Sequence, residues 1–358
     1  MKQIIFVTVS MGGGGTERVI SILANYYCQK NICVTILMIA DNRVAYELDK
    51  RVKVVTVSGA TGGKWLERVK RVTALRKYLK KNSNARVIAM GTVSAMFTLL
   101  AKIGLACDVV ISERNDPNRL NHKPISRIVK VLRNFLYWRA KAIVFQTEDV
   151  KECFPACLIK KSLVIPNPIS MSLPEVCLNE NREKSVLTAG RLTEQKNHKL
   201  LINAFCEFHK THPEYSLDIY GKGELEEDLR NYVCEKRMQE YIHICGFCDD
   251  LYKKLQVGGM YVSSSNWEGI SNSLIEALAL GIPTIATDCP VGGSRMFISN
   301  MENGMLINVN DEVGLLRAMN KVADDREFAI RISERAMQIR ELLSIEQIAM
   351  KWMDTFGD

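Results

Sequence analysis

Residues 260–298 of this 358-residue chain constrain its fold more than any other stretch. The apolar run 260–262 predicts a short buried strand. A polar loop follows, and then a helix over 273–280 that Gly281 and Pro283 end. A second apolar run covers 283–286. Strand, loop, helix and strand in this order bring unpaired N–H groups and the positive end of a helix dipole to one place, so the stretch predicts an anion-binding site.

Two carboxylates frame this predicted site. Glu268 precedes the helix and Glu276 lies in its second turn, with seven residues between them. Carboxylates accept hydrogen bonds from hydroxyl groups, and sugars carry many hydroxyls. The stretch resembles the Glu-x7-Glu signature of retaining glycosyltransferases of family four, especially in its setting Ser-Asn-Trp-Glu-Gly-Ile-Ser. The alternative interpretation is an ordinary Rossmann-type βαβ unit with surface acids.

The resemblance implies the α/β class and the GT-B fold, in which two Rossmann-like domains with parallel sheets face a deep cleft. The chain is long enough for two such domains. We expect an N-terminal acceptor-side domain over 1–168 and a polar linker over 169–184. A C-terminal nucleotide-sugar-binding domain over 185–340 follows, and a helix over 341–358 crosses back to the first domain.

Further segments carry the same resemblance. A predicted strand at 3–9 leads into four glycines at 12–15 and then Thr-Glu-Arg; the spacing does not fit a dinucleotide motif but resembles the family's Gly-Gly-x-Glu-Arg loop. Residues 190–198 resemble its Gly-Arg-Leu-x-x-Gln-Lys-Asn segment, and 221–224 and 246–247 also match, the last in the nucleobase region. The implied donor-binding residues are Gly14, Gly15, Gly190, Gly221, Gly246, Phe247, Glu268, Gly269, Ile270, Ser271, Asn272 and Glu276.

The implied reaction moves a sugar from a nucleotide diphosphate sugar to an acceptor hydroxyl, with retention. Arg191 and Lys196 would stabilise the charge on the leaving diphosphate, as preorganised donors do. Glu268 would hold hydroxyls of the donor sugar, and Glu276 those of the ribose. No carboxylate nucleophile is evident, so front-face attack is implied. The chain contains no Asp-x-Asp sequence, so we expect neither a metal nor another cofactor beside the nucleotide-sugar co-substrate.

Polar residues after a predicted strand at 108–112 are candidates for the acceptor side. Glu113, Arg114 and Asn115 stand where open α/β sheets bind ligands. Related transferases often carry a His at this position, and Arg114 stands near it. The alternative is that residues 114–117 simply form a turn.

Charge is divided unequally along the chain. Residues 1–180 carry 28 Lys and Arg against 13 Asp and Glu, whereas the remainder has more acids than bases. Segment 64–82 is a basic amphipathic helix candidate, and 121–142 interleaves cations with apolar residues and lacks acids. Both favour contact with an anionic membrane; packing of 64–82 on its own domain is the alternative. No apolar run reaches the length of about 18 residues that spans a membrane.

The preferred acceptor is a polyprenyl-diphosphate-linked glycan, as in bacterial relatives that build surface polysaccharides. We therefore expect a cytoplasmic protein, peripheral at the inner face of the membrane. The alternatives are a soluble acceptor, a nucleotide-sugar epimerase or phosphorylase, and a basic RNA- or membrane-binding module with an inactive cleft. Aromatic content of 7% and the lack of a nucleic-acid motif argue against RNA. The eleven scattered cysteines indicate reduced thiols.

Overall fold

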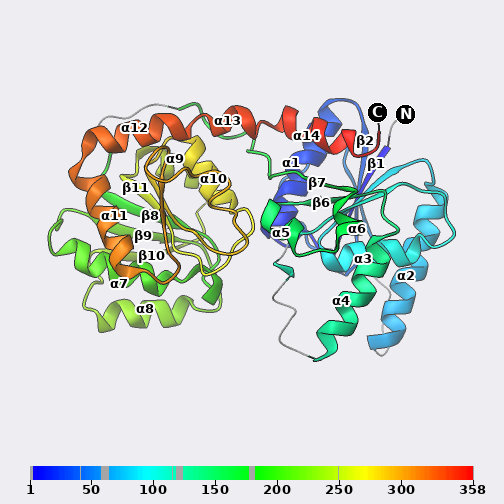
Figure 1. Cartoon of the computed structure of the whole chain (residues 1–358), viewed down its shortest axis with the longest axis horizontal. Coiled ribbons are helices and arrows are strands. Elements are labelled where there is room, and N and C mark those ends of the chain that lie inside the picture. Colours follow the sequence, from blue (N-terminus) through cyan, green and yellow to red (C-terminus); the bar gives the residue numbers. More distant parts are fainter. Residues whose placement is uncertain are drawn as a thin grey trace. The chain divides into compact units, whose positions relative to one another are not determined.

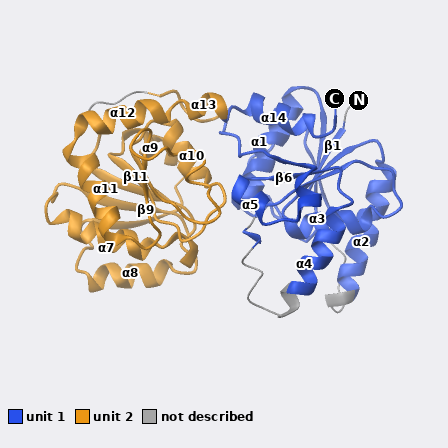
Figure 2. Ribbon diagram, in the orientation of Figure 1, with its two compact units in different colours: residues 1–171, 343–358 blue, residues 172–342 orange. Residues whose placement is uncertain are grey.

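The computed structural model describes residues 3–40, 42–57, 64–114, 116–117, 124–176, 182–248 and 250–357 (Figure 1). The chain divides into two compact units (Figure 2). The first unit comprises residues 1–171 and 343–358, and the second comprises 172–342. Residue 115 and residues 177–181 of the linker expected at 169–184 lie outside the described residues.

The first unit is built on a parallel sheet. Its strand order is β3-β2-β1-β4-β5-β6-β7, and every adjacent pair is parallel. The central strands consist mainly of apolar residues, many of them β-branched, and are buried except at Gln3, as expected for a sheet covered on both faces. The strands are β1 Gln3–Thr8, β2 Cys33–Met38, β3 Lys53–Thr56, β4 Arg86–Met90, β5 Val109–Ser112, β6 Ala142–Phe145 and β7 Ser162–Val164.

Helices connect these strands, and one helix reaches the unit from the end of the chain. The helices are α1 Gly15–Gln29, α2 Lys64–Lys81, α3 Thr92–Ala101, α4 Pro124–Tyr137, α5 Glu148–Glu152, α6 Ala156–Ile159 and α14 Ile345–Asp354. Helix α3 packs against both α2 and α4. Helix α14 packs on α1, where the Tyr27 hydroxyl donates to the Ala349 carbonyl at 2.8 Å and Trp352 is fully buried. These contacts make the last residues part of the first unit's core.

The second unit repeats the same strand pattern. Its sheet has the order β10-β9-β8-β11-β12-β13, again with parallel neighbours. Strand order reverses between β8 and β11, and in open α/β sheets ligands bind beyond the carboxyl ends of the strands at such a switch point. The strands are β8 Ser185–Ala189, β9 Ser216–Tyr220, β10 Ile242–Gly246, β11 Met260–Ser263, β12 Thr284–Thr287 and β13 Met305–Ile307.

Helices and one 3₁₀ turn complete the second unit. They are η2 Glu194–Lys196, α7 His198–His209, α8 Glu226–Glu235, α9 Leu251–Val257, α10 Asn272–Ala279, α11 Glu312–Asp324, α12 Arg326–Ala336 and α13 Ile339–Leu342. Helix α10 occupies the place predicted for 273–280, one residue earlier at each end. Apolar side chains from α7, α11 and the strands form one continuous core, in which Phe205 and Phe208 are fully buried.

Segment 64–82 forms helix α2, which packs on its own unit for part of its length, and contact with a membrane stays a prediction. Leu75 and Leu79 are buried in the first unit, whereas Leu66 and Val69 near the start of the helix are exposed. No helix of the described residues is long and apolar enough to cross a membrane.

Candidate functional site

The loops that follow β8 and β11 meet at the switch point of the second unit. Gln195 donates through Nε2 to the Trp267 carbonyl at 3.0 Å, and the Asn266 N–H donates to the Gln195 carbonyl at 2.8 Å. The Ser264 hydroxyl donates to the Lys196 carbonyl at 2.9 Å. These hydrogen bonds hold together two segments that are about 70 positions apart in the sequence.

Lys196 and Glu268 form an ion pair across this junction. Lys196 Nζ lies 2.5 Å from Glu268 Oε2, and both side chains are mostly buried. Burial alone would lower the pKa of Lys196, but the charge of Glu268 and its hydrogen bond outweigh burial and leave that pKa raised. Lys196 therefore stays cationic at neutral pH. Its Nζ also lies 3.4 Å from Ser271 Oγ, at the start of α10.

Glycines let backbone and side chains approach closely around Lys196. A Cβ on Gly190 would lie 2.8 Å from Lys196 Cε, and a Cβ on Gly221 would lie 1.8 Å from the Gly190 carbonyl oxygen. Gly221 also has a φ of 140°, which disfavours other residues. Gly190 and Gly221 thus serve the site by making room for the lysine and for the strand-end backbone.

The amino terminus of α10 opens beside the ion pair. Ser271 precedes its first residue and makes no side-chain cap hydrogen bond. The Ser273 hydroxyl donates to the Ala189 carbonyl at 2.8 Å and accepts from Tyr261 at 2.8 Å, which fixes the first turn against the end of β8. Ile270 is buried beneath this turn. A helix start with N–H groups beside a lysine is an arrangement that accepts an anion.

Glu276 is buried in the second turn of α10. Its Oε1 accepts a hydrogen bond from the Tyr252 hydroxyl at 3.0 Å, which holds the carboxylate from helix α9. Gly269 lies between the two glutamates, and a Cβ on Gly293 would lie only 1.5 Å from its carbonyl oxygen. Gly293, Tyr252 and Tyr261 support the site but carry no motif, so sequence reasoning missed these roles.

Other predicted residues of the second unit are held less firmly. Arg191 is exposed, and its Nη2 reaches Gln195 Oε1 only at 3.5 Å. Phe247 is an exposed side chain that follows Gly246, whose φ is 69°. Both side chains are less restrained than that of Lys196.

His198 is a buried neighbour of the site that the motif reasoning did not use. It begins α7, two residues after Lys196. Burial, with a contribution from the charge of Lys196, lowers the pKa of His198 to about 4. The imidazole is therefore neutral at neutral pH.

The predicted residues of the first unit are described within that unit. Gly14 and Gly15 form the turn that starts α1, where the Gly14 carbonyl accepts from Tyr46 at 3.0 Å. Glu113 is buried and accepts from Thr92 at 2.5 Å and Tyr137 at 2.7 Å. These contacts place the Glu113 carboxylate inside the unit.

Arg114 also points into the first unit. Its Nη1 donates to Asn167 Oδ1 at 2.5 Å, and its guanidinium lies 5.8 Å from the ring of Trp352. Burial lowers the pKa of Arg114 to about 10, so it remains charged. Asn115 lies outside the described residues. Within the described part of the chain, no three His, Cys, Asp or Glu side chains gather as a metal site; metal independence stays a prediction.

Comparison with known proteins gives a family match for the second unit and relatives for the whole chain. Residues 174–339 match the family model described as glycosyl transferases group 1. A Campylobacter jejuni relative is named GalNAc-alpha-(1->4)-GalNAc-alpha-(1->3)-diNAcBac-PP-undecaprenol alpha-1,4-N-acetyl-D-galactosaminyltransferase. It is 26% identical over 365 residues, covering 100% of this chain and 99% of the relative. The amylovoran biosynthesis glycosyltransferase AmsD of Erwinia amylovora is 24% identical over 370 residues, with 99% of each chain covered.

Solved structures show the same fold. The crystal structure of Anabaena HepE in complex with UDP-glucose superposes with a TM-score of 0.84 at 17% identity, covering 100% of both chains. These likenesses show that the chain has the GT-B fold. The second unit matches the model of the glycosyl transferases group 1 over nearly all its length, and the predicted fold class is confirmed.

Proposed function

We propose that this chain is a retaining glycosyltransferase that moves a hexose or N-acetylhexosamine from a UDP-linked donor to a hydroxyl of a lipid-linked glycan. The observation that carries the proposal is the Lys196–Glu268 pair beside the start of α10, at the switch point of the second unit. The pair puts a cation for phosphate and an acceptor for sugar hydroxyls next to each other.

In the proposed step, the acceptor hydroxyl oxygen bonds to the anomeric carbon on the face that the leaving group occupies. The bond from that carbon to the diphosphate oxygen breaks, and the electron pair remains on the diphosphate. The acceptor proton passes to a phosphate oxygen. Lys196, Arg191 and the N–H groups at the start of α10 stabilise the growing charge, and one such donor commonly contributes about 3–4 kcal/mol.

In this proposal, the two glutamates bind different parts of the donor. Glu268 gives up part of its pairing with Lys196 and accepts hydrogen bonds from the sugar hydroxyls, while the lysine turns to phosphate. Glu276, held by Tyr252, accepts from the ribose. UDP is proposed because HepE was solved with UDP-glucose.

The lipid-linked acceptor is supported by names of relatives and by the surface of the first unit. The Campylobacter jejuni relative is named for an undecaprenol-linked substrate. Helix α4 exposes Ile128 (71%), Val131 (70%) and Phe135 (64%), and Trp138 just beyond it (65%). Their spacing of three and four residues puts these side chains on one face. We propose that this face enters the membrane interface, with the protein at the cytoplasmic side.

A second feature of the same unit fits a lipid. A cavity of about 680 Å³ lies between α2 and α3, with mostly apolar walls that include Val72, Phe97 and Leu100. Arg68 and Arg71 also line it. An apolar cavity with cations can take a hydrocarbon chain next to a phosphate, so we propose it as a contact for the acceptor lipid.

A transfer assay tests the proposal. Purified protein with UDP-sugars and a polyprenyl-diphosphate glycan should release UDP only with both substrates, without added metal, and the product should keep the donor's anomeric configuration. Transfer to a soluble sugar alone would overturn the lipid acceptor. Epimerised donor or a sugar phosphate product would overturn transfer itself.

Sedimentation with vesicles tests the membrane contact. Changing Ile128, Val131 and Phe135 to Gln should abolish binding to anionic vesicles, because the apolar face is lost. Changing the exposed α2 residues Lys77 and Lys80 to Gln should only weaken it in proportion to charge, by about 1 kcal/mol each before screening. Unchanged binding of the α4 variant would contradict this contact.

A further inference from the structure

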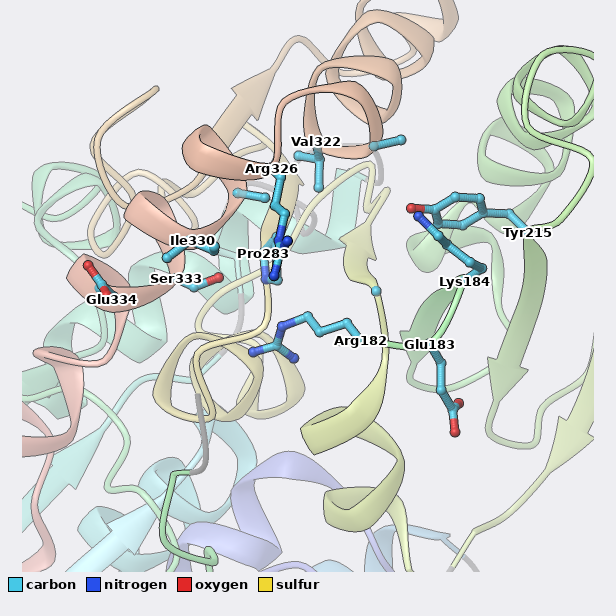
Figure 3. Close-up of a pocket in the computed structure, with 13 residues that line it drawn as sticks. Arg182, Glu183, Lys184, Tyr215, Pro283, Val322, Arg326, Ile330, Ser333 and Glu334 are labelled. Carbon is cyan, nitrogen blue, oxygen red and sulfur yellow. The ribbon is translucent and has the colours of Figure 1, made fainter. Parts of the chain in front are cut away.

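A second cavity lies in the second unit at the opposite edge of the sheet from the donor site. It has a volume of about 430 Å³. Its walls come from the amino ends of four strands, including Lys184 before β8, Tyr215 before β9 and Pro283 before β12, and from α11 and α12 (Figure 3). Because the sheet is parallel, this edge is remote from Lys196 and Glu268, which follow the carboxyl ends.

Cations dominate the inside of this cavity. Arg182, Lys184 and Arg326 all line it. In Figure 3 the guanidinium groups of Arg182 and Arg326 point into the same part of the cavity, whereas the carboxylates of Glu183 and Glu334 point away from that part. The cavity therefore presents net positive charge to a ligand.

Hydrogen bonds hold the guanidinium of Arg182 in the wall of this cavity. Its guanidinium donates to the carbonyls of Gln256 and Gly258 at 3.2 Å each and to that of Gly281. Among the described residues, no carboxylate forms an ion pair with it. Burial lowers the pKa of Arg182 to about 10, so the group is still charged at neutral pH. A buried charge without a counter-charge favours an anion nearby.

Ser333 gives a second, independent indication that this cavity binds a ligand. The residue lies on α12, is only 2% exposed and lines the cavity, and Figure 3 shows its hydroxyl on the side that faces Arg326. Within the described residues the Ser333 Oγ has no hydrogen-bond partner. A buried hydroxyl without a partner is costly, so such a group in a polar cavity indicates a bound molecule that completes it.

We propose that this cavity binds the phosphate of a small phosphorylated molecule between Arg182, Arg326 and Ser333. Arginine matches phosphate geometry with paired N–H donors, and a serine hydroxyl can donate to a further oxygen. The volume falls in the range of small-molecule sites and exceeds what phosphate alone requires, so the remainder of the ligand fills the apolar part beside Val322 and Ile330. This site is separate from the proposed glycosyl transfer and does not depend on it.

Thermal unfolding with inorganic phosphate and with ribose 5-phosphate, against chloride at equal ionic strength, tests the proposal. Both probes should raise the unfolding midpoint, with the larger rise for ribose 5-phosphate. Arg326→Gln should weaken binding roughly tenfold or more, since it removes a charged hydrogen-bond donor. Arg331→Gln, an equal charge change on an exposed position of the same helix, should leave binding unchanged.

Two further variants separate this site from the alternatives. In Lys196→Ala, which lacks the donor-site cation, the rise should persist; its disappearance would place the phosphate at the donor site and overturn the proposal. Ser333→Ala should reduce the rise. If instead Ser333→Ala raises the midpoint equally with and without phosphate, the hydroxyl is only an unpartnered core group and the proposal fails. No rise in the parent protein would also overturn it.

Discussion

The residues that follow the carboxyl ends of the strands are arranged differently in the two units. In the second unit, the loops after β8 and β11 bring Lys196 and Glu268 together at the site. In the first unit, the residues that follow β5, Glu113 and Arg114, turn into the unit and bond to its own side chains. The two loops of the second unit thus converge on one place, whereas the acceptor-side role of Glu113 and Arg114 stays a prediction.

Burial alone does not distinguish Lys196 in the second unit from Arg114 in the first. Lys196 and Arg114 are both mostly buried cations, but Lys196 faces a carboxylate and the start of a helix, whereas Arg114 lies against Asn167 and Trp352. In the proposed function, Lys196 exchanges its carboxylate partner for a ligand phosphate. The arrangement around Arg114 ties β5, the segment after β7 and α14 into one core. The comparison thus predicts functional effects from one unit and stability effects from the other.

The largest effect is expected for Lys196→Ala. Turnover should fall by about 10²–10³-fold, because the cation that stabilises the leaving diphosphate is lost. Arg191→Ala should also lower turnover by orders of magnitude while the protein stays folded. Steady-state kinetics with circular dichroism as a folding control measure both. Lys199→Ala, an exposed neighbour on α7, is the matched control. Near-parental rates in Lys196→Ala and Arg191→Ala would contradict the assignment.

His198 should make the second unit sensitive to acid. Its pKa of about 4 in the folded protein is below the ordinary 6.5, so the unfolded chain takes up a proton first as the pH falls. The free energy of unfolding should therefore drop between pH 6.5 and pH 4, by on the order of 3 kcal/mol. Urea unfolding across this range should show a smaller drop in His198→Gln. Equal drops in both proteins would show that His198 does not titrate in this way.

The two glutamates should differ in what they affect. Glu268→Gln should keep affinity for free nucleoside diphosphate and lose transfer, because Glu268 contacts the sugar. Glu276→Ala should weaken nucleotide affinity itself, roughly tenfold, because a hydrogen bond from ribose to a charged group is lost. Calorimetry with UDP distinguishes the two variants. If both behave alike, the division of roles between them is wrong.

The smallest effect on donor binding is expected for Arg114→Met. Loss of the hydrogen bond to Asn167 should lower the free energy of unfolding by about 1–3 kcal/mol, and UDP affinity should not change. Urea denaturation and calorimetry measure the two quantities. A variant that keeps its stability but loses acceptor affinity would instead support the acceptor-side role that the sequence suggests.

Sequence reasoning predicted a site in the second unit because its loops carry dense motifs beside strands that can be recognised from apolar runs, and the structure brings Lys196 and Glu268 of these loops together. It could not see that Lys196 pairs with Glu268, or that Tyr252 holds Glu276, because those partners are distant in the chain. It also assigned no helix to 92–101. Helix α3 lacks a clear amphipathic period because it packs against both α2 and α4.

In the first unit, the sequence did not indicate which way the side chains of Glu113 and Arg114 point. Composition indicates that Glu113 and Arg114 are polar residues at a strand end, but not that Thr92, Tyr137 and Asn167 supply their partners from inside. The basic segments were recognised from charge, whereas the outward apolar face of α4 became evident only when the opposite face was found to be buried.

The most direct test of the central claim is a thermal-unfolding panel of nucleotide sugars on the parent protein, Lys196→Ala and Arg114→Met. We expect one UDP-sugar to stabilise the parent protein, by about 2.7 kcal/mol at 100 times its dissociation constant. That gain should persist in Arg114→Met and vanish in Lys196→Ala. Stabilisation that survives in Lys196→Ala, or no response to any nucleotide sugar, would contradict the claim that the β8 and β11 loops form the donor site.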